Sequence, residues 1–210
     1  MFPSLYPILD PSILPTTLLK FATTLADAGA SLIQLRDKRA PARKVYFEAQ
    51  ELIAHLATRG VRVIVNDRPD IAALAGAGGV HVGQGDLPVE EARRICGATR
   101  WVGVSTHNLE QLREAVTTSA DYIAVGPIFP TATKENPDPI VGIEFVREAR
   151  KLTRKPIVAI GGITLDTAAS VFAAGADSIA VIRDLLSAGD PAARVREYLA
   201  VAERVRAARP

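Results

Sequence analysis

The chain has 210 residues, of which 48% are hydrophobic and 23% are charged, and its formal net charge is +2. This size and balance fit one globular domain, spanning 1–210, and exclude a disordered or low-complexity chain. A charge so close to zero, without a basic stripe, argues against a general nucleic-acid binder. The arginines near the C-terminus alternate with Glu197 and Glu203, which is typical of a solvated helix face.

The N-terminal stretch MFPSLYPILD lacks a basic region followed by a long apolar run, so we expect no signal peptide. No uninterrupted apolar run approaches ~18 residues, so we expect no transmembrane helix. The lone cysteine, Cys96, excludes an internal disulfide, and the pattern EEARRIC favours a buried thiol over a reactive one. We therefore expect a cytoplasmic protein without membrane or nucleic-acid partners, and either a single chain or a homo-oligomer is consistent with the sequence.

Eight short apolar runs alternate with helix-like segments along the chain. Their continuous apolar character is typical of parallel strands that are covered on both faces. The segments between them are rich in Ala, Leu, Glu and Arg, several end at Gly, and Asn108 with Gln111 predicts a helix cap. The predicted strands are 5–9, 31–35, 62–65, 79–82, 101–104, 122–125, 157–160 and 178–182.

Eight strands alternating with helices in about 200 residues predict an α/β fold, a single (β/α)₈ TIM barrel. A doubly wound open sheet is the competing architecture, but eight strands in so short a chain leave it little room for other elements. In such a barrel the functional site forms at the carboxyl ends of the strands. The residues that follow each strand are therefore the candidate site residues.

The second strand runs into QLRDK, which places Gln34, Arg36 and Lys38 at alternate positions. Alternation puts all three side chains on one side of an extended strand. Burying them together is costly without an anionic partner, so they predict an anion site rather than a solvated strand end.

The third strand ends in VNDRPD and the fourth in GVHVGQGD, so Asn66, Asp67 and Asp86 reach the same end of the barrel. Either aspartate alone is best interpreted as a helix cap or a turn residue. As a pair on neighbouring strand ends beside two cations, Asp67 and Asp86 suit Mg²⁺, which takes one or two carboxylates together with phosphate oxygens.

The histidines and Ser105 do not predict a metal or a nucleophile. His81 lies inside the fourth strand and is best interpreted as a satisfied core residue, while His107 follows the fifth strand and could belong to a helix start. Neither has a Cys or a second His at metal spacing, so we expect no zinc site. Ser105 lacks a G-x-S-x-G context, so we predict a hydrogen-bond donor to substrate rather than a nucleophile.

A second anion site is predicted from the last three strands. A Gly-Gly in AIGGI after the seventh strand, with the backbone amides that open a helix after the eighth, forms the usual phosphate site of a barrel. The sixth strand is followed by GPIFPTATK, so we expect Thr131, Thr133 and Lys134 to lie between the two anion sites. Two anionic substrates, or one molecule with two phosphates, would fit.

The motifs QLRDK, VNDRPD, GVHVGQGDLP, VGVSTH, GPIFPTATK, AIGGI and GADSIAVI, in this order and spacing, resemble those of the thiamine-phosphate synthase (thiamine-phosphate pyrophosphorylase) family. The resemblance runs from the first strand to the start of the last helix. It implies a Mg²⁺-dependent transferase that joins hydroxymethylpyrimidine diphosphate to thiazole phosphate, giving thiamine phosphate and pyrophosphate. It also implies a dissociative displacement at the pyrimidine methylene, which needs no protein nucleophile and no strong base.

The resemblance assigns roles to single residues of this chain. It implies catalytic roles for Arg36, Lys38, Ser105 and Lys134. It also implies that Asp67 and Asp86 bind the metal. The pyrimidine diphosphate would be bound by Gln34, Leu35, Arg36, Asp37, Lys38, Asn66, Ser105 and Lys134. The thiazole phosphate would be bound by Thr131, Ala132, Thr133, Gly162, Ile182 and Arg183. The family usually has Ser at the position of Arg183, so the phosphate would meet the backbone N–H, the guanidinium or both.

Two other functions are compatible with the same barrel. A thiazole tautomerase shares the fold and the phosphate site but lacks the full diphosphate and metal set. A non-catalytic sensor of a phosphate ligand would not need a metal site. The presence of Arg36, Lys38, Asp67, Asp86 and Lys134 together favours the synthase.

Overall fold

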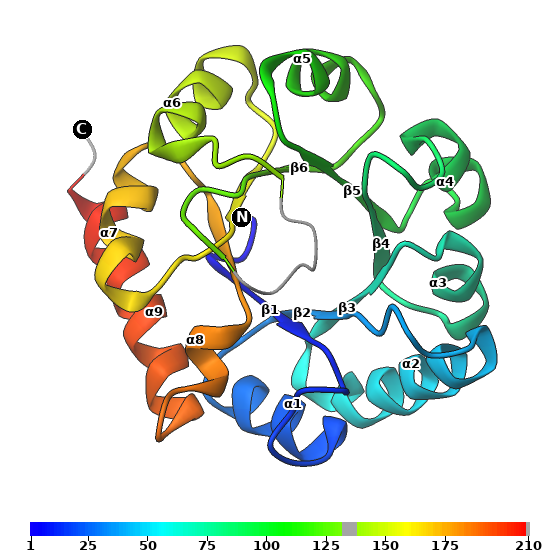
Figure 1. The fold of residues 1–210 in the computed structure, drawn as a ribbon. Helices are drawn as coiled ribbons and strands as arrows, with labels where there is room; N and C mark the ends of the chain where they lie inside the picture. Colours follow the sequence, from blue (N-terminus) through cyan, green and yellow to red (C-terminus); the bar gives the residue numbers. More distant parts are fainter. Residues whose placement is uncertain (132–137, 209–210) are drawn as a thin grey trace.

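A computed structural model describes residues 1–131 and 138–208. Eight parallel strands close into a barrel in chain order, and β1 pairs with β8 to complete it (Figure 1). The prediction of a (β/α)₈ TIM barrel is confirmed. The strands are β1 Leu5–Leu9, β2 Leu32–Leu35, β3 Arg62–Asn66, β4 Gly79–Val82, β5 Trp101–Thr106, β6 Tyr122–Val125, β7 Ile157–Ile160 and β8 Ser178–Val181.

Helices form an outer ring around the strands (Figure 1). None of those in the described ranges is long and apolar enough to cross a membrane. The predicted cap is present, because the Asn108 side chain accepts a hydrogen bond from the Gln111 N–H at 2.9 Å. The helices are α1 Leu18–Asp27, α2 Ala42–Leu56, α3 Pro69–Ala75, α4 Val89–Cys96, α5 Leu109–Thr117, α6 Gly142–Leu152, α7 Leu165–Ala173, α8 Arg183–Leu186 and α9 Pro191–Ala207, with a 3₁₀ turn η1 at Ala57–Arg59.

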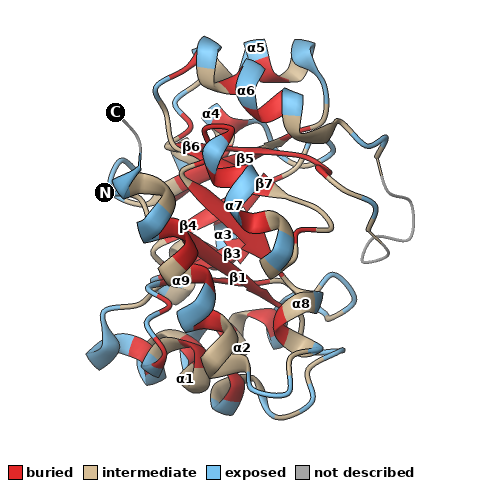
Figure 2. Cartoon of the chain, turned by 90° about the vertical axis from the view of Figure 1, so that its left-hand side faces the viewer, coloured by how far each residue is buried: buried red, intermediate tan, exposed pale blue. Residues whose placement is uncertain are grey.

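The apolar residues form two layers, as the alternation of side chains along a strand requires. One layer lies between the strands and the helices, and Figure 2 shows the buried residues concentrated there and in the strands. It includes Ile33 and Leu35 of β2. The second layer fills the barrel and includes Leu32 of the same strand. Gln34 shares the parity of Leu32, so its side chain faces the barrel interior, and so does that of Arg36.

The amino-terminal end of the barrel is filled by aromatic side chains. The Phe2 ring stacks on Trp101 with centroids 5.1 Å apart and lies 5.2 Å from the Tyr122 ring. The Arg62 guanidinium covers the Trp101 ring at 4.1 Å. The opposite end, where the strands finish, is therefore the end at which a ligand can enter the barrel.

Cys96 lies at the end of α4 and is 1% exposed, as the apolar pattern predicted. Burial raises the pKa of its thiol. A buried thiol with a raised pKa carries little thiolate at neutral pH, so it is a structural residue.

Candidate active site

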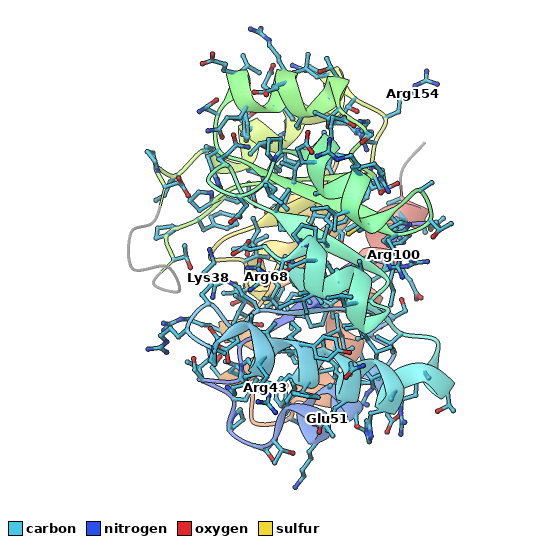
Figure 3. All side chains as sticks on the ribbon, turned by 90° about the vertical axis from the view of Figure 1, so that its right-hand side faces the viewer. Lys38, Arg43, Glu51, Arg68, Arg100 and Arg154 are labelled. Carbon is cyan, nitrogen blue, oxygen red and sulfur yellow. The ribbon has the colours of Figure 1, made fainter. Side chains whose placement is uncertain are left out.

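A cavity of about 630 Å³ opens at the carboxyl ends of the strands. Figure 3 shows Lys38 at this end of the molecule, with Arg100 and Arg154 toward the opposite end. Eleven of the predicted site residues line the cavity, which brings together side chains from every part of the chain: Gln34, Arg36, Lys38, Asn66, Asp67, Asp86, Ser105, Thr131, Gly162, Ile182 and Arg183.

Within the described ranges, two predicted residues are not among those lining the cavity. The Leu35 side chain packs in the layer between strands and helices. The Asp37 carboxylate turns toward its own loop, where it accepts hydrogen bonds from the N–H groups of Arg39 and Ala40 and from Lys44 at 2.9 Å. These two positions have only their backbone to offer a ligand. Ala132, Thr133 and Lys134 lie outside the described residues.

Arg36 is fixed by an ion pair at the edge of the cavity. Its Nη1 lies 3.3 Å from Oδ2 of Asp10, and its backbone N–H donates to the Leu9 carbonyl at 2.9 Å. The other oxygen of Asp10 accepts from the N–H and the hydroxyl of Ser12. The guanidinium is therefore held from one side, and its remaining N–H donors can meet a phosphate.

Lys38, Asp67 and Asp86 lie together at the neighbouring part of the rim. The ammonium of Lys38 is 3.1 Å from Oδ2 of Asp67, and Oδ2 of Asp86 accepts from the Gly83 N–H at 2.7 Å. Asp67 adopts a φ of 61°, which is unusual for a residue other than glycine and common at functional sites. Burial and the adjacent Asp86 carboxylate raise the pKa of Asp67, although Lys38 opposes this.

This pair of carboxylates fits one class of metal ion. In the described ranges no group of three or more His, Cys, Asp and Glu side chains could hold a metal. A site made entirely of protein ligands, as for structural zinc, is thus absent from that part of the chain. Mg²⁺ instead keeps several waters and takes one or two carboxylates with substrate phosphates. Asp67 and Asp86 are adjacent carboxylates that line an open cavity, and the pKa of Asp67 is raised by burial and by Asp86, so the pair matches this requirement.

Gln34 and Ser105 line the inner part of the cavity, and each bonds to an interior side chain. The Gln34 Nε2 donates to the Tyr6 hydroxyl at 2.9 Å, and the Ser105 Oγ lies 2.9 Å from Nε2 of His81. His81 is 7% exposed and hydrogen-bonded, which confirms the prediction of a satisfied core histidine. It also lines the cavity, which the sequence analysis did not predict.

Gly162, one of the residues predicted to bind a phosphate, lies where β7 meets the segment that follows β6. Gly162 has a φ of 63°, and a Cβ on it would lie 2.3 Å from the Pro130 carbonyl oxygen. The Phe129 N–H donates to the Gly161 carbonyl at 3.0 Å, which ties the two segments together. Helix α8 begins at Arg183, and the first N–H groups of a helix have no acceptor within it. Glycine is required at 162 because no side chain fits this approach.

His107 joins two sides of the rim, a contact that the sequence did not indicate. Its Nδ1 lies 2.6 Å from the Gly126 carbonyl oxygen, so this nitrogen carries the proton. Its Nε2 lies 3.5 Å from Oδ2 of Asp138. The residue that follows β5 therefore contacts Gly126, directly after β6, and Asp138, which precedes α6.

Comparisons with known proteins show the family of the chain. The family model described as thiamine monophosphate synthase matches residues 5–185. A thiamine-phosphate synthase of Koribacter versatilis is 48% identical over 206 residues, covering 95% of each chain. Another, of Myxococcus xanthus, is 42% identical over 202 residues, covering 96% of this chain and 93% of the relative. A solved thiamine phosphate pyrophosphorylase from Pyrococcus furiosus is 33% identical with a TM-score of 0.87, covering 96% of each chain. The chain described here belongs to the thiamine monophosphate synthase family.

Proposed function

We propose that this cavity condenses hydroxymethylpyrimidine diphosphate with thiazole phosphate, in the presence of Mg²⁺, to give thiamine phosphate and pyrophosphate. The observation that carries the proposal is the arrangement of charge around the cavity. Arg36 and Lys38 line the cavity together with Asp67 and Asp86, and Lys38 contacts Asp67. The glycine turn at Gly162 lines the same cavity. The charged group suits a diphosphate with a metal, and the glycine turn suits a single phosphate.

The diphosphate is the leaving group, so its negative charge must be stabilised as the bond to the methylene breaks. Arg36 and Lys38 would donate to its oxygens, and Asp67 with Asp86 would hold Mg²⁺ against them. When bound, the metal supplies further neutralisation of the departing charge. Charged donors fixed in advance stabilise such a charge more strongly than water does, and the Asp10 ion pair fixes Arg36 in this way.

The pyrimidine would occupy the inner part of the cavity, with Gln34, Asn66 and Ser105 within reach. Its electron-rich ring can bear positive charge at the methylene once the diphosphate departs. The inner wall is apolar, with Ile8, Ala124, Val158, Ile160 and Ala180 among the lining residues. Such a wall would keep water away from the cation until the thiazole nitrogen captures it. We also assign Lys134 to the diphosphate, on the resemblance of GPIFPTATK to the family motif.

The thiazole phosphate would bind where the backbone of Gly162, Ile182 and Arg183 lines the cavity. Thr131 would contribute its hydroxyl from the other side, and Ala132 and Thr133 follow it along the chain. The two substrates would then lie side by side, with the reacting atoms between the two proposed anion sites. Holding them in line is then the main contribution of the protein, because the route needs no nucleophile and no strong base.

The test is a coupling assay with both substrates and Mg²⁺, in which we expect thiamine phosphate and pyrophosphate to form in equal amounts. Replacing Asp67 with Asn should reduce turnover by at least about 100-fold while the thiazole phosphate still binds. Asp70→Asn is the matched control, because Asp70 pairs with Arg68 on the surface and does not line the cavity. A folded wild-type protein that forms no product would contradict the proposal. Full turnover in Asp67→Asn would contradict the metal assignment.

A further inference from the structure

Five side chains form a continuous hydrogen-bonded path through the barrel interior, which we call the polar network: Gln34, Tyr6, Tyr122, His81 and Ser105. The two phenol oxygens lie 2.9 Å apart, and the Tyr122 hydroxyl lies 3.1 Å from Nδ1 of His81. Gln34 and Ser105 complete the path at its two ends. Only these ends and their immediate neighbours reach the cavity, whereas Tyr122 is fully buried.

Both phenols keep their protons at neutral pH. Tyr6 is 1% exposed and Tyr122 is 0% exposed. Burial raises the pKa of each phenol well above its ordinary value. Each hydroxyl therefore has one proton to donate, and a buried hydroxyl without partners is costly.

These single protons give the polar network a direction. The Gln34 amide donates to Tyr6, so Tyr6 uses its own proton toward Tyr122. In this direction Tyr122 donates to Nδ1 of His81, and a neutral imidazole would then carry its proton on Nε2. The Nε2–H donates to Ser105, so the hydroxyl proton of Ser105 is left to point into the cavity. At the other end, the amide oxygen of Gln34 is left to accept, beside the second N–H of the same amide.

We propose that the polar network fixes the hydrogen-bonding polarity of the cavity, with an acceptor presented by Gln34 and a donor presented by Ser105. Tyr6, Tyr122 and His81 are positioning residues, because they set this polarity through their hydrogen bonds to Gln34 and Ser105. The proposal rests on the proposed function, because it concerns how the pyrimidine is recognised. A 4-aminopyrimidine matches this polarity, since its amino group donates and its ring nitrogens accept. A 4-oxopyrimidine, with a carbonyl beside a ring N–H, presents the reverse pattern.

Gly103 makes room for the central member of the polar network. It pairs in register with Tyr122, and a Cβ built on it would lie 2.0 Å from Cζ of the Tyr122 ring. A side chain at 103 would therefore displace the phenol. The hydroxyl of Tyr122 reaches both Tyr6 and His81 only because this position has no side chain.

The direction can be measured without substrate, by ¹⁵N NMR of the histidine rings in the full chain. There are three histidines, so the His81 signals are assigned with variants at His55 and His107. We expect a neutral ring with the proton on Nε2. A proton on Nδ1, or a doubly protonated ring at neutral pH, would overturn the proposal. Because no ligand is present, this result is independent of whether the proposed function holds.

The second test is the preference for an amino over an oxo pyrimidine, measured as the ratio of dissociation constants of the two diphosphates by calorimetry with Mg²⁺. We expect wild type to bind the amino compound more tightly than the oxo compound. In Tyr122→Phe, the ratio of the two dissociation constants should shift by at least about tenfold toward the oxo compound. Thr106→Val is the matched control, since it removes a buried hydroxyl bond to the Ala124 carbonyl that lies outside the polar network. Tyr6→Phe breaks the network at a second point should Tyr122→Phe not fold. An unchanged ratio in both variants would overturn the proposal.

Discussion

The guanidinium of Arg36 lies 3.3 Å from the carboxylate of Asp10, and each of these side chains is only 15% exposed. The two residues follow neighbouring strands, because Leu9 of β1 pairs in register with Leu35 of β2. Asp10 is held in turn by two hydrogen bonds from Ser12. The carboxylate of Asp10 therefore fixes the orientation of the guanidinium that we propose binds the diphosphate.

Replacing Asp10 with Asn should lower the catalytic efficiency with the pyrimidine diphosphate. The guanidinium would lose its charged partner and spread over several orientations, so fewer molecules would meet the diphosphate correctly. We expect kcat/KM for this substrate to fall about tenfold, the equivalent of roughly 1.4 kcal/mol. Steady-state kinetics at saturating thiazole phosphate measure the effect. Asp27→Asn, which breaks an exposed pair with Arg59, should leave kcat/KM unchanged; equal losses in both variants would show that Asp10 has no special role.

Asp37 should affect stability in a pH-dependent way. Although its burial acts in the opposite direction, hydrogen bonds from Lys44 and from the Ala40 and Arg39 N–H groups lower the pKa of this carboxyl. A lowered folded-state pKa stabilises the fold above the unfolded value of about 3.9, and this contribution is lost as the pH falls below it. We expect Asp37→Asn to lower the free energy of unfolding by about 1 kcal/mol at pH 7. Near pH 3 its free energy of unfolding should approach that of wild type.

Chemical denaturation of wild type and Asp37→Asn between pH 7 and pH 3 measures this difference. Glu48, whose pKa is raised by burial and also by the Asp37 charge, is replaced with Gln in both proteins so that its titration does not enter the comparison. Asp166→Asn serves as control, since Asp166 lies in the first turn of α7, away from the Asp37 loop. A cost that stays constant over the whole range would show that the Asp37 charge does not stabilise the loop.

The positions of the strands could be predicted from the sequence to within two residues. Continuous apolar runs occur only where a strand is covered on both faces, and the barrel covers every strand in this way. The largest difference is β5, which continues to Thr106 rather than ending at 104. Ser105 and Thr106 are polar, so the apolar run stops before the backbone pairing does. Both residues still pair in register with β6.

The site could be predicted only where a single strand end carries the signal. The parity of QLRDK correctly placed the side chains of Gln34 and Arg36 toward the interior. The same parity sends Leu35 outward, into the layer that faces the helices. The contact between Tyr6 and Tyr122 spans 116 positions in the sequence and depends on how the barrel closes. No spacing within one motif carries that information, so the polar network could not have been predicted.

Gly162→Ala should damage the thiazole phosphate site and the fold together. The residue has a φ of 63°, and the new Cβ would lie 2.3 Å from the Pro130 carbonyl oxygen. The backbone must therefore shift, at a cost of at least about 2 kcal/mol. We expect a lower free energy of unfolding and a raised KM for thiazole phosphate. Gly189→Ala is the matched control because nothing lies within 4 Å of its added Cβ. Wild-type stability in Gly162→Ala would show that the turn is free to adjust.

Arg183→Ser restores the residue that the family usually has at the start of α8, and it tests which group meets the thiazole phosphate. Arg183 lines the cavity beside Ile182, and it carries both a guanidinium and a backbone N–H that can donate to an anion. A guanidinium binds phosphate through charged, paired hydrogen bonds that serine cannot replace. We expect KM for thiazole phosphate to rise about fivefold, with the KM for the pyrimidine diphosphate within about twofold of wild type. Arg196→Ser, an exposed substitution on α9, should change neither constant. An unchanged KM in Arg183→Ser would show that the backbone N–H alone binds the phosphate, and a lowered KM would show that the arginine side chain obstructs the site.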